Sequence, residues 1–277
     1  MRDTAMPVAI GGVGGSGTRV VAALLQRLGY YIGADVNKAL DNLWFTLLFK
    51  RRAILLETHS EFSELCAQFW ARMEGQPKLD EASRDLIAGF ARRNRMQHQA
   101  AWLQKRADTW FSTPPRSARP WGWKEPNTHL LIDRLFDLRP ELRYIHVGRN
   151  PLDMALSTNQ NQLEYWGAIL LGRGVEIGPR DALSYCCAVM RRIERLSDAY
   201  PGRICKVDFD QLCDDPATIC QQVADFLGTG YEEADKDWFC DLVQQGAPVV
   251  GRHKRACSSH FAPTDLHYAA RCGYVLG

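Results

Sequence analysis

Short apolar runs alternate with longer amphipathic segments along most of this 277-residue chain. A continuous apolar run of about 4–8 residues between turn residues indicates a buried strand, whereas apolar positions spaced three and four apart indicate a helix. These patterns predict strands at Pro7–Gly11, Trp121–Lys124, Arg143–Gly148 and Arg203–Val207. They predict helices at Thr18–Leu28, Asn37–Phe49, Thr128–Leu138, Arg180–Tyr200 and Pro216–Leu227, and from Glu61 to Arg106 with an interruption near Gly75-Gln76-Pro77.

The order of these elements predicts the fold class. Strands separated by helices pair in parallel, because the chain crosses back over the sheet between them with a right-handed turn. We therefore expect an α/β protein with three layers, in which a central parallel sheet is flanked by helices. Gly11, Lys124 and Arg149 stand at the ends of predicted strands. Because such sheets bind ligands beyond the carboxyl ends of their strands, these residues should converge there.

The composition excludes several classes of protein. The hydrophobic fraction of 46% and the charged fraction of 24% are ordinary for a globular chain, and the length suits one domain over residues 1–277. A net charge of +2 gives no overall field for nucleic acid. No apolar stretch is long enough to span a bilayer, and Met1–Met6 lacks the apolar centre of a signal peptide. A cytoplasmic protein with no transmembrane segment and no nucleic-acid partner is expected.

The cysteines do not indicate a metal site. The chain has nine of them, and none forms the C-x-x-C pair that is common in zinc sites. In a reducing compartment most should be small buried side chains. We expect no bound metal.

The segment from Val8 to Arg19 carries the strongest chemical signal. An apolar run ends in a glycine-rich turn and continues into a helical pattern, which is the arrangement that cradles a phosphate group at a helix N-terminus. Glycines allow the backbone amides to approach the anion, and hydroxyl groups add donors. The candidate anion-binding residues are therefore Gly14, Gly15, Ser16, Gly17, Thr18 and Arg19. The loop is similar to a Walker A loop, but Thr18 stands where the Walker lysine would be, which disfavours a kinase or ATPase.

A second motif follows the predicted strand Arg143–Gly148. Arg149 lies at the strand end, Pro151 suits the first turn of a helix, and Ser157 lies about two helical turns further on. The guanidinium group of arginine donates two parallel hydrogen bonds to a phosphate. This segment resembles the 3′-phosphate motif of the sulfotransferases that use 3′-phosphoadenosine 5′-phosphosulfate (PAPS), in which an arginine and a serine eight positions later bind that phosphate. The glycine turn with its Ser-Gly-Thr sequence likewise resembles the 5′-phosphosulfate loop of this family.

Two further segments resemble the same family, at Trp121–Pro126 and from Cys205 to Leu227. The resemblance implies a P-loop-like fold and transfer of a sulfuryl group from PAPS to a hydroxyl or amine of a small-molecule, lipid or carbohydrate acceptor. It also implies that a divalent metal is not obligatory, because a sulfuryl group carries less negative charge than a phosphoryl group. Residues 37–115 match the family least, and we interpret them as a helical insertion on the acceptor side.

The chain departs from the family at Gly15, where many sulfotransferases have a lysine or arginine that stabilises the bridging oxygen. Lys124, at a strand end, is the better candidate for that role, and Arg19 is the other. Lys124, Glu125 and Asp41 are our catalytic candidates, although adjacent strand residues such as Lys124 and Glu125 face opposite ways. The general base stays open among Glu125, Glu57, His59, Asp35 and Asp41.

By the resemblance, the basic segment Gly251–Arg255 closes over the cofactor through Arg252 and Lys254; the alternative is a solvated charge cluster. Most aromatic residues between Trp44 and Phe111 have helical spacing and should lie in the core, and a few are candidates for stacking on an acceptor ring. Two alternatives to a sulfotransferase remain: a P-loop kinase that acts on a small molecule, and a nucleotide-binding protein of the same fold without catalytic activity.

Overall fold

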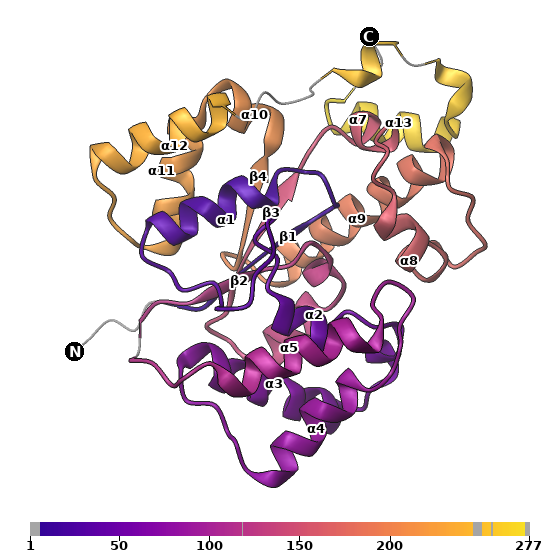
Figure 1. Ribbon diagram of the computed structural model, residues 1–277. Coiled ribbons are helices and arrows are strands. Elements are labelled where there is room, and N and C mark those ends of the chain that lie inside the picture. The colour runs from indigo at the N-terminus through magenta and orange to yellow at the C-terminus, as the bar shows by residue number, and fades with distance from the viewer. Residues whose placement is uncertain (1–5, 118, 246–250, 256, 275–277) are drawn as a thin grey trace.

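The computed structural model describes residues 6–117, 119–245, 251–255 and 257–274 (Figure 1). Its centre is a sheet of four strands in the order β2-β1-β3-β4, and every neighbouring pair is parallel. The strands are β1 (Val8–Gly12), β2 (Gly122–Lys124), β3 (Arg143–Gly148) and β4 (Ile204–Asp208). The expected fold class, an α/β protein with a central parallel sheet, is confirmed. All four predicted strands exist, with bounds shifted by at most one residue.

Helices cover both faces of the sheet, and a further group of helices lies below the sheet in this view (Figure 1). One face carries α1 (Thr18–Arg27), α11 (Pro216–Leu227) and α12 (Glu233–Gln245). The other face carries the following helices: α6 (Ile132–Leu138), α7 (Pro151–Ala155), α8 (Asn161–Leu171), α9 (Pro179–Ala199) and α13 (Pro263–Arg271). The remaining helices are α2 (Leu43–Phe49), α3 (His59–Glu74), α4 (Glu81–Ala91), α5 (Ala100–Ser112) and α10 (Phe209–Asp214), with 3₁₀ turns η1 (Arg52–Leu56), η2 (Pro126–Leu130), η3 (Arg252–Arg255) and η4 (Ser258–His260).

The alternation of side chains along the strands divides the core in two. Val8 and Ile10 of β1 pack with α1, α11 and α12. Ala9 of β1 and Tyr144 of β3 face the opposite way, into a larger cluster with α9 and the layer α2–α5. Successive strand residues point to opposite faces, so β1 and β3 each supply both clusters.

The aromatic residues of the α2–α5 layer pack against one another. Phe45 stacks on Phe49 and Trp123 with ring centroids 4.6 and 5.6 Å apart, and Phe69 meets Trp123 edge-on at 5.3 Å. All four rings are at most 1% exposed. The prediction that most aromatic residues of this region lie in the core is confirmed.

Three predicted helices differ from the structure. The helix expected at Asn37–Phe49 begins only at Leu43, because the Asn37 side chain accepts hydrogen bonds from the amides of Ala39 and Asp41 and holds a turn there. The segment Glu61–Arg106 is broken twice, at the expected glycine and again between α4 and α5. The helix expected at Thr128–Leu138 divides into η2 and α6.

Two further features bear on the expectations from sequence. All nine cysteines are free thiols, and five of them are buried. Among the residues that the structure describes, none of the helices has both the length and the apolar character needed to cross a bilayer.

Candidate active site

The turn between β1 and α1 is shaped to hold an anion. Gly15 and Gly17 have φ angles of 96° and 90°, in the left-handed region that favours glycine. Gly17 is the N-cap of α1, no side chain among the described residues caps the helix, and its first turn contains no acidic residue. The first amides of a helix have no partner within the helix, and its dipole is positive at this end. The N-terminus of α1 is therefore available to a negatively charged group.

Close packing explains two of the glycines. A Cβ atom on Gly17 would lie 2.1 Å from the ring of Phe209, the first residue of α10. A Cβ atom on Gly12 would lie 2.3 Å from the carbonyl oxygen of Val147 in β3. The turn is thus held between β3 and α10, and only glycine fits at these positions.

The polar groups of the turn divide between holding its shape and facing a ligand. The Gly14 amide donates to Gln162 Oε1 of α8 at 3.2 Å, and Gln162 Nε2 donates to the Gly12 carbonyl at 3.2 Å. The Ser16 side chain is 1% exposed, and its hydroxyl has no hydrogen-bond partner within the described residues. A buried polar atom without a partner is unfavourable, so Ser16 suits a site that an anion completes.

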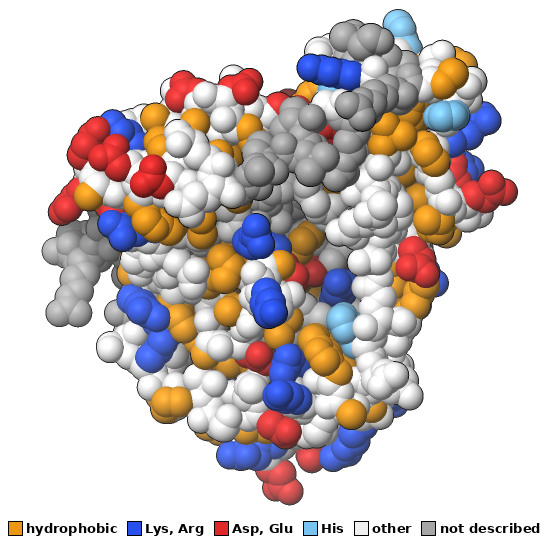
Figure 2. All heavy atoms as spheres, turned by 45° about the horizontal axis from the view of Figure 1, so that its top comes forward, with side chains coloured by type: hydrophobic (Ala, Val, Ile, Leu, Met, Phe, Trp, Pro, Cys, Tyr) orange, Lys and Arg blue, Asp and Glu red, His pale blue; other side chains and the backbone are white. Residues whose placement is uncertain are grey.

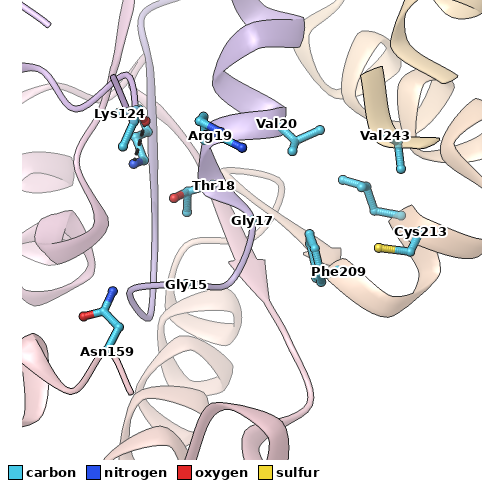
Figure 3. Close-up of a pocket in the computed structure, with 12 residues that line it drawn as sticks. Gly15, Gly17, Thr18, Arg19, Val20, Lys124, Asn159, Phe209, Cys213 and Val243 are labelled. Atoms are coloured by element: carbon cyan, nitrogen blue, oxygen red, sulfur yellow. Dashed lines mark hydrogen bonds between the residues drawn. The ribbon is translucent and has the colours of Figure 1, made fainter. Parts of the chain in front are cut away.

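A cavity of about 340 Å³ opens beside this turn (Figure 3). Lys124 and Asn159 lie on one side of the turn in this view, and Phe209, Cys213 and Val243 lie on the other. The cavity brings together two residues that sequence reasoning proposed as alternative cations, Lys124 and Arg19. The full lining is Gly15, Gly17, Thr18, Arg19, Val20, Ala39, Lys124, Asn159, Phe209, Leu212, Cys213 and Val243.

Lys124, which lines the cavity, forms an ion pair with Asp41. Lys124 is the last residue of β2, and its ammonium group donates to Asp41 Oδ1 and, at 3.1 Å, to the carbonyl oxygen of Ala39. The lysine side chain is 3% exposed, and the aspartate side chain is 21% exposed. Asp41 Oδ2 also accepts from Asn37 Nδ2 at 2.8 Å. The turn that replaces the predicted helix therefore positions a carboxylate against the candidate catalytic lysine.

Glu125 points away from Lys124, as expected for the next residue of an extended segment. Its carboxylate accepts from the backbone and side-chain amides of Asn127 at 2.7 and 2.8 Å and lies 3.6 Å from Lys50 Nζ. Burial raises the pKa of Glu125, an effect that the charge of Lys50 opposes. Glu125 is fully buried beside a separate cavity of about 10 Å³, against Phe45 and Trp166, and is not part of the wall of the large cavity.

The other candidate bases also lie outside the cavity wall. Asp35 pairs with Arg106 at 3.0 Å and accepts from the Thr109 hydroxyl at 2.5 Å. Glu57 pairs with Arg51 at 2.7 Å, and His59 is an exposed first residue of α3. Of the candidate bases, the structure places only Asp41 in contact with a residue of the cavity wall, within the part of the chain that it describes.

Arg149 reaches the glycine turn from the end of β3. Its Nη1 donates to the Gly15 carbonyl at 3.3 Å, its Nη2 lies 3.5 Å from Asp153, and its guanidinium lies 5.0 Å from the centre of the Phe209 ring. It lines a neighbouring cavity of about 230 Å³ together with Lys206. Phe209 therefore contacts both Gly17 and Arg149, between the two cavities.

Ser157 is not on a helix. We expected the helix of the second motif to carry it, but α7 ends at Ala155. The side chain of Gln160 donates to the carbonyl oxygens of Met154 and Ser157 at 3.1 and 2.7 Å and ends the helix there. The Ser157 hydroxyl accepts from the Asn159 amide at 3.2 Å, and Asn159, rather than Ser157, lines the large cavity.

The basic C-terminal segment docks on α7. The amides of Gly251 and His253 donate to Asp153 at 2.8 and 2.9 Å. Lys254 is exposed, and the side chain of Arg252 lies outside the part of the chain that the structure describes. Basic side chains also occupy the middle of the face shown in Figure 2, while most acidic side chains lie nearer its edge.

Sequence reasoning missed Asn159, Phe209, Cys213 and Gln162 as parts of the site. An asparagine, a glutamine and a phenylalanine far from the glycine turn have no motif of their own. They reach the turn only because the sheet brings the ends of β1, β3 and β4 to one edge. Within the described residues, no group of three or more histidine, cysteine, aspartate or glutamate side chains is arranged to hold a metal ion.

Comparisons with known proteins show the family to which the chain belongs. Residues 7–233 match the model of the sulfotransferase family. The sulfotransferase domain of the Synechococcus PCC 7002 olefin synthase has a similar structure, with a TM-score of 0.50 and 16% identity over 98% of this chain and 95% of that chain. A sulfotransferase from Alicyclobacillus acidocaldarius aligns with a TM-score of 0.45 and 13% identity over 98% and 96%. Among curated proteins there is no significant match. By its sequence over most of its length, this chain belongs to the sulfotransferase family.

Proposed function

We propose that the protein transfers the sulfuryl group of PAPS to a hydroxyl or amine of a small-molecule, lipid or carbohydrate acceptor. One observation carries the proposal: the N-terminus of α1 and Lys124 line one cavity, and in the part of the chain that the structure describes neither that helix end nor the Ser16 hydroxyl of the same turn has a side-chain partner. Membership of the sulfotransferase family supports a transferase. The cavity of about 340 Å³ is within the usual size for a small-molecule site, roughly 300–1,000 Å³.

The residues of the turn suit the 5′-phosphosulfate end of PAPS. The amides at Gly15, Gly17 and Thr18 and the hydroxyls of Ser16 and Thr18 would donate to its oxygens, and the positive end of α1 would favour its charge. Arg19 is exposed at the same edge and would add a cation to the 5′-phosphate. The amide of Gly14 would contribute indirectly, because it holds the turn through Gln162.

The 3′-phosphate would bind beside Arg149. The guanidinium group of Arg149 already contacts the glycine turn, and its planar donors match a phosphate. Ser157, Arg252 and Lys254 are the further candidates, and the first of these lies on the segment that contributes Asn159 to the large cavity. A 3′-phosphate would therefore be distinguished from a free hydroxyl by charge.

The reaction needs a cation at the leaving oxygen and a base for the acceptor. The acceptor atom forms a bond to sulfur, the bond between sulfur and the 5′-phosphate oxygen breaks, and adenosine 3′,5′-bisphosphate leaves with the bonding electrons. Lys124 would stabilise the charge that develops on that oxygen, since Gly15 supplies no side chain for the purpose.

Asp41 is the base that this geometry favours. In the free protein the Lys124 ammonium binds Asp41. An anionic donor in the cavity would compete for that ammonium, and the released carboxylate would lie at the edge of the cavity, where it accepts the proton of the acceptor. Glu125 has no comparable path to the cavity, because Asn127 and Lys50 hold it on the other side of the segment.

An acceptor screen with PAPS labelled in its sulfuryl group tests the proposal. Label should pass to at least one class of alcohol or amine, and Lys124→Met should slow the transfer about a hundredfold or more. Tight binding of adenosine 3′,5′-bisphosphate without transfer to any acceptor would favour a nucleotide-binding protein without activity. Transfer of a phosphoryl group from ATP to the same acceptors would favour the kinase alternative.

A further inference from the structure

A buried carboxylate on α7 holds the basic C-terminal segment. Asp153 is 0% exposed, and its two oxygens accept from the amides of Gly251 and His253 at 2.8 and 2.9 Å. Nδ1 of His253 lies 2.6 Å from the same carboxylate, and its ring also lies 3.3 Å from Asn150 Nδ2. The fourth partner of Asp153 is Arg149, at 3.5 Å. One side chain thus joins the C-terminal segment to the candidate 3′-phosphate arginine.

Because burying a charge is costly, Asp153 needs the hydrogen-bond donors of the C-terminal segment. An ionised carboxylate without partners is strongly disfavoured in the interior of a protein. Burial would raise the pKa of Asp153, but the hydrogen bonds from His253 and Gly251 hold it below its ordinary value. Three of these contacts come from residues about a hundred positions away in the chain. Asp153 is therefore satisfied by the C-terminal segment only when that segment lies beside α7.

We propose that Asp153 is a positioning residue that docks the basic turn Gly251–Arg255 beside Arg149 and so completes the binding site for the 3′-phosphate of the donor. This inference rests on the proposed function, in which a 3′-phosphate binds at Arg149. The turn contains an arginine, a lysine and a second arginine in addition to its histidine. Docking brings the backbone of this cationic turn to the residue that anchors Arg149, and several cations around one phosphate strengthen its binding.

The negative charge of Asp153 does not oppose this role. Each of its oxygens is engaged by donors of the turn or by Arg149, and its side chain has no exposed surface. Donors of the protein itself therefore surround the charge of Asp153, while the side chain of Lys254 in the docked turn is exposed to solvent. Asp153 acts through the residues that it positions and does not itself contact the donor.

Asp153→Asn tests the proposal, because the substitution keeps the volume of the side chain and removes its charge and one acceptor. Asp181→Asn is the matched control: Asp181 is also a buried carboxylate in the first turn of a helix, and it accepts from an arginine, Arg173, and from a backbone amide, that of Glu176. Two quantities are measured in the full-length protein. One is the rate of trypsin cleavage within Gly251–Arg255, and the other is the ratio of affinities for adenosine 3′,5′-bisphosphate and adenosine 5′-monophosphate.

We expect Asp153→Asn to speed cleavage in the turn and to lower the affinity ratio by about tenfold, the effect of losing one hydrogen bond to a charged group. Asp181→Asn should change neither. His253→Ala, which leaves the backbone contacts in place, should produce a smaller change in the same direction and provides a test if Asp153→Asn does not fold. Unchanged cleavage in both Asp153→Asn and His253→Ala, or faster cleavage with an unchanged ratio, overturns the proposal.

The two measurements separate this inference from the proposed function. If the wild-type protein binds both nucleotides equally, the assignment of the 3′-phosphate site is wrong, and the purpose that we give to Asp153 is wrong with it. The cleavage rates then still show whether Asp153 holds the turn, because they do not depend on any nucleotide.

Discussion

Replacement of Lys124 should separate catalysis from binding. Lys124→Met keeps most of the side-chain volume at a position that is 3% exposed and removes only the ammonium group. In the free protein that group is bound to Asp41 and Ala39, so its loss should lower the free energy of unfolding by about 1–3 kcal/mol. We expect the folded variant to bind the donor through the glycine turn as before, since the backbone amides and hydroxyls of the turn are untouched.

The effect on turnover should be much larger. A donor directed at a charge that develops only in the transition state typically contributes about 2.7–4 kcal/mol, which corresponds to roughly 10²–10³ in rate. Turnover should therefore fall about a hundredfold or more in Lys124→Met, while the KM for PAPS and the affinity for adenosine 3′,5′-bisphosphate change little. Steady-state kinetics with labelled PAPS and calorimetry with the product nucleotide measure the two effects.

Arg19→Ala is the comparison that makes this result decisive. Arg19 lines the same cavity but is exposed at the start of α1, so its loss should weaken nucleotide binding and the transition state to a similar extent. The variant should show a raised KM and a nearly normal kcat. Near-normal turnover in Lys124→Met, together with a collapse of kcat in Arg19→Ala, would show that the roles of the two cations are reversed.

Four further predictions concern the rest of the site and the fold. Arg149→Ala should remove about 2–4 kcal/mol of the preference for adenosine 3′,5′-bisphosphate over adenosine 5′-monophosphate, because a charge-assisted bidentate contact is lost; equal losses for both nucleotides in calorimetry would contradict the assignment. Gly17→Ala should abolish nucleotide binding and destabilise the protein more than Gly29→Ala. Gly29 has a similar φ of 86°, but apart from its chain neighbours no atom of the described residues lies within 4 Å of the added Cβ, so Gly29→Ala should cost only about 1–2 kcal/mol of backbone strain in urea unfolding. Burial lowers the pKa of His146 from 6.5 to about 3, so the unfolded chain binds a proton that the folded protein does not as the pH falls below 6.5. The neutral histidine therefore costs the folded protein nothing above pH 6.5, and it lowers the free energy of unfolding by about 2 kcal/mol at pH 5. His146→Gln should lessen that loss, and an identical pH dependence of unfolding in both proteins would refute the reasoning. Turnover should persist in EDTA, because Lys124 and the turn amides supply the charge that the leaving oxygen needs, and a loss that magnesium restores would argue for phosphoryl-type chemistry.

The sequence was sufficient for the sheet, the glycine turn and the order of the main elements. The strand bounds were predicted to within one residue, because each strand is a short, mostly buried segment that turn residues separate from a longer helical pattern. The glycine turn was also predictable, since a strand, a glycine-rich turn and a helix N-terminus are adjacent in sequence and their geometry is local. The order of the strands along the chain placed Lys124 and the turn at one edge of the sheet.

Side chains that hydrogen-bond to nearby backbone amides or carbonyl oxygens explain the places where the helix predictions failed. Asn37 binds the amides of Ala39 and Asp41, and this turn places Asp41 against Lys124 instead of continuing the predicted helix. Gln160 likewise ends α7 before Ser157. Apolar spacing is the same in both outcomes, so periodicity cannot distinguish a helix from a turn held by one polar side chain.

Contacts between distant segments are what only the tertiary structure decided. Gln162 holds the glycine turn across about 150 residues, Phe209 lies against both Gly17 and Arg149, and Asp153 binds the turn at His253 about a hundred residues later. None of these side chains carries a local signature, because each depends on the crossing of the chain between parallel strands. Sequence therefore determined the chemistry that the turn can perform, and the packing of the sheet and its helices determined which side chains surround it.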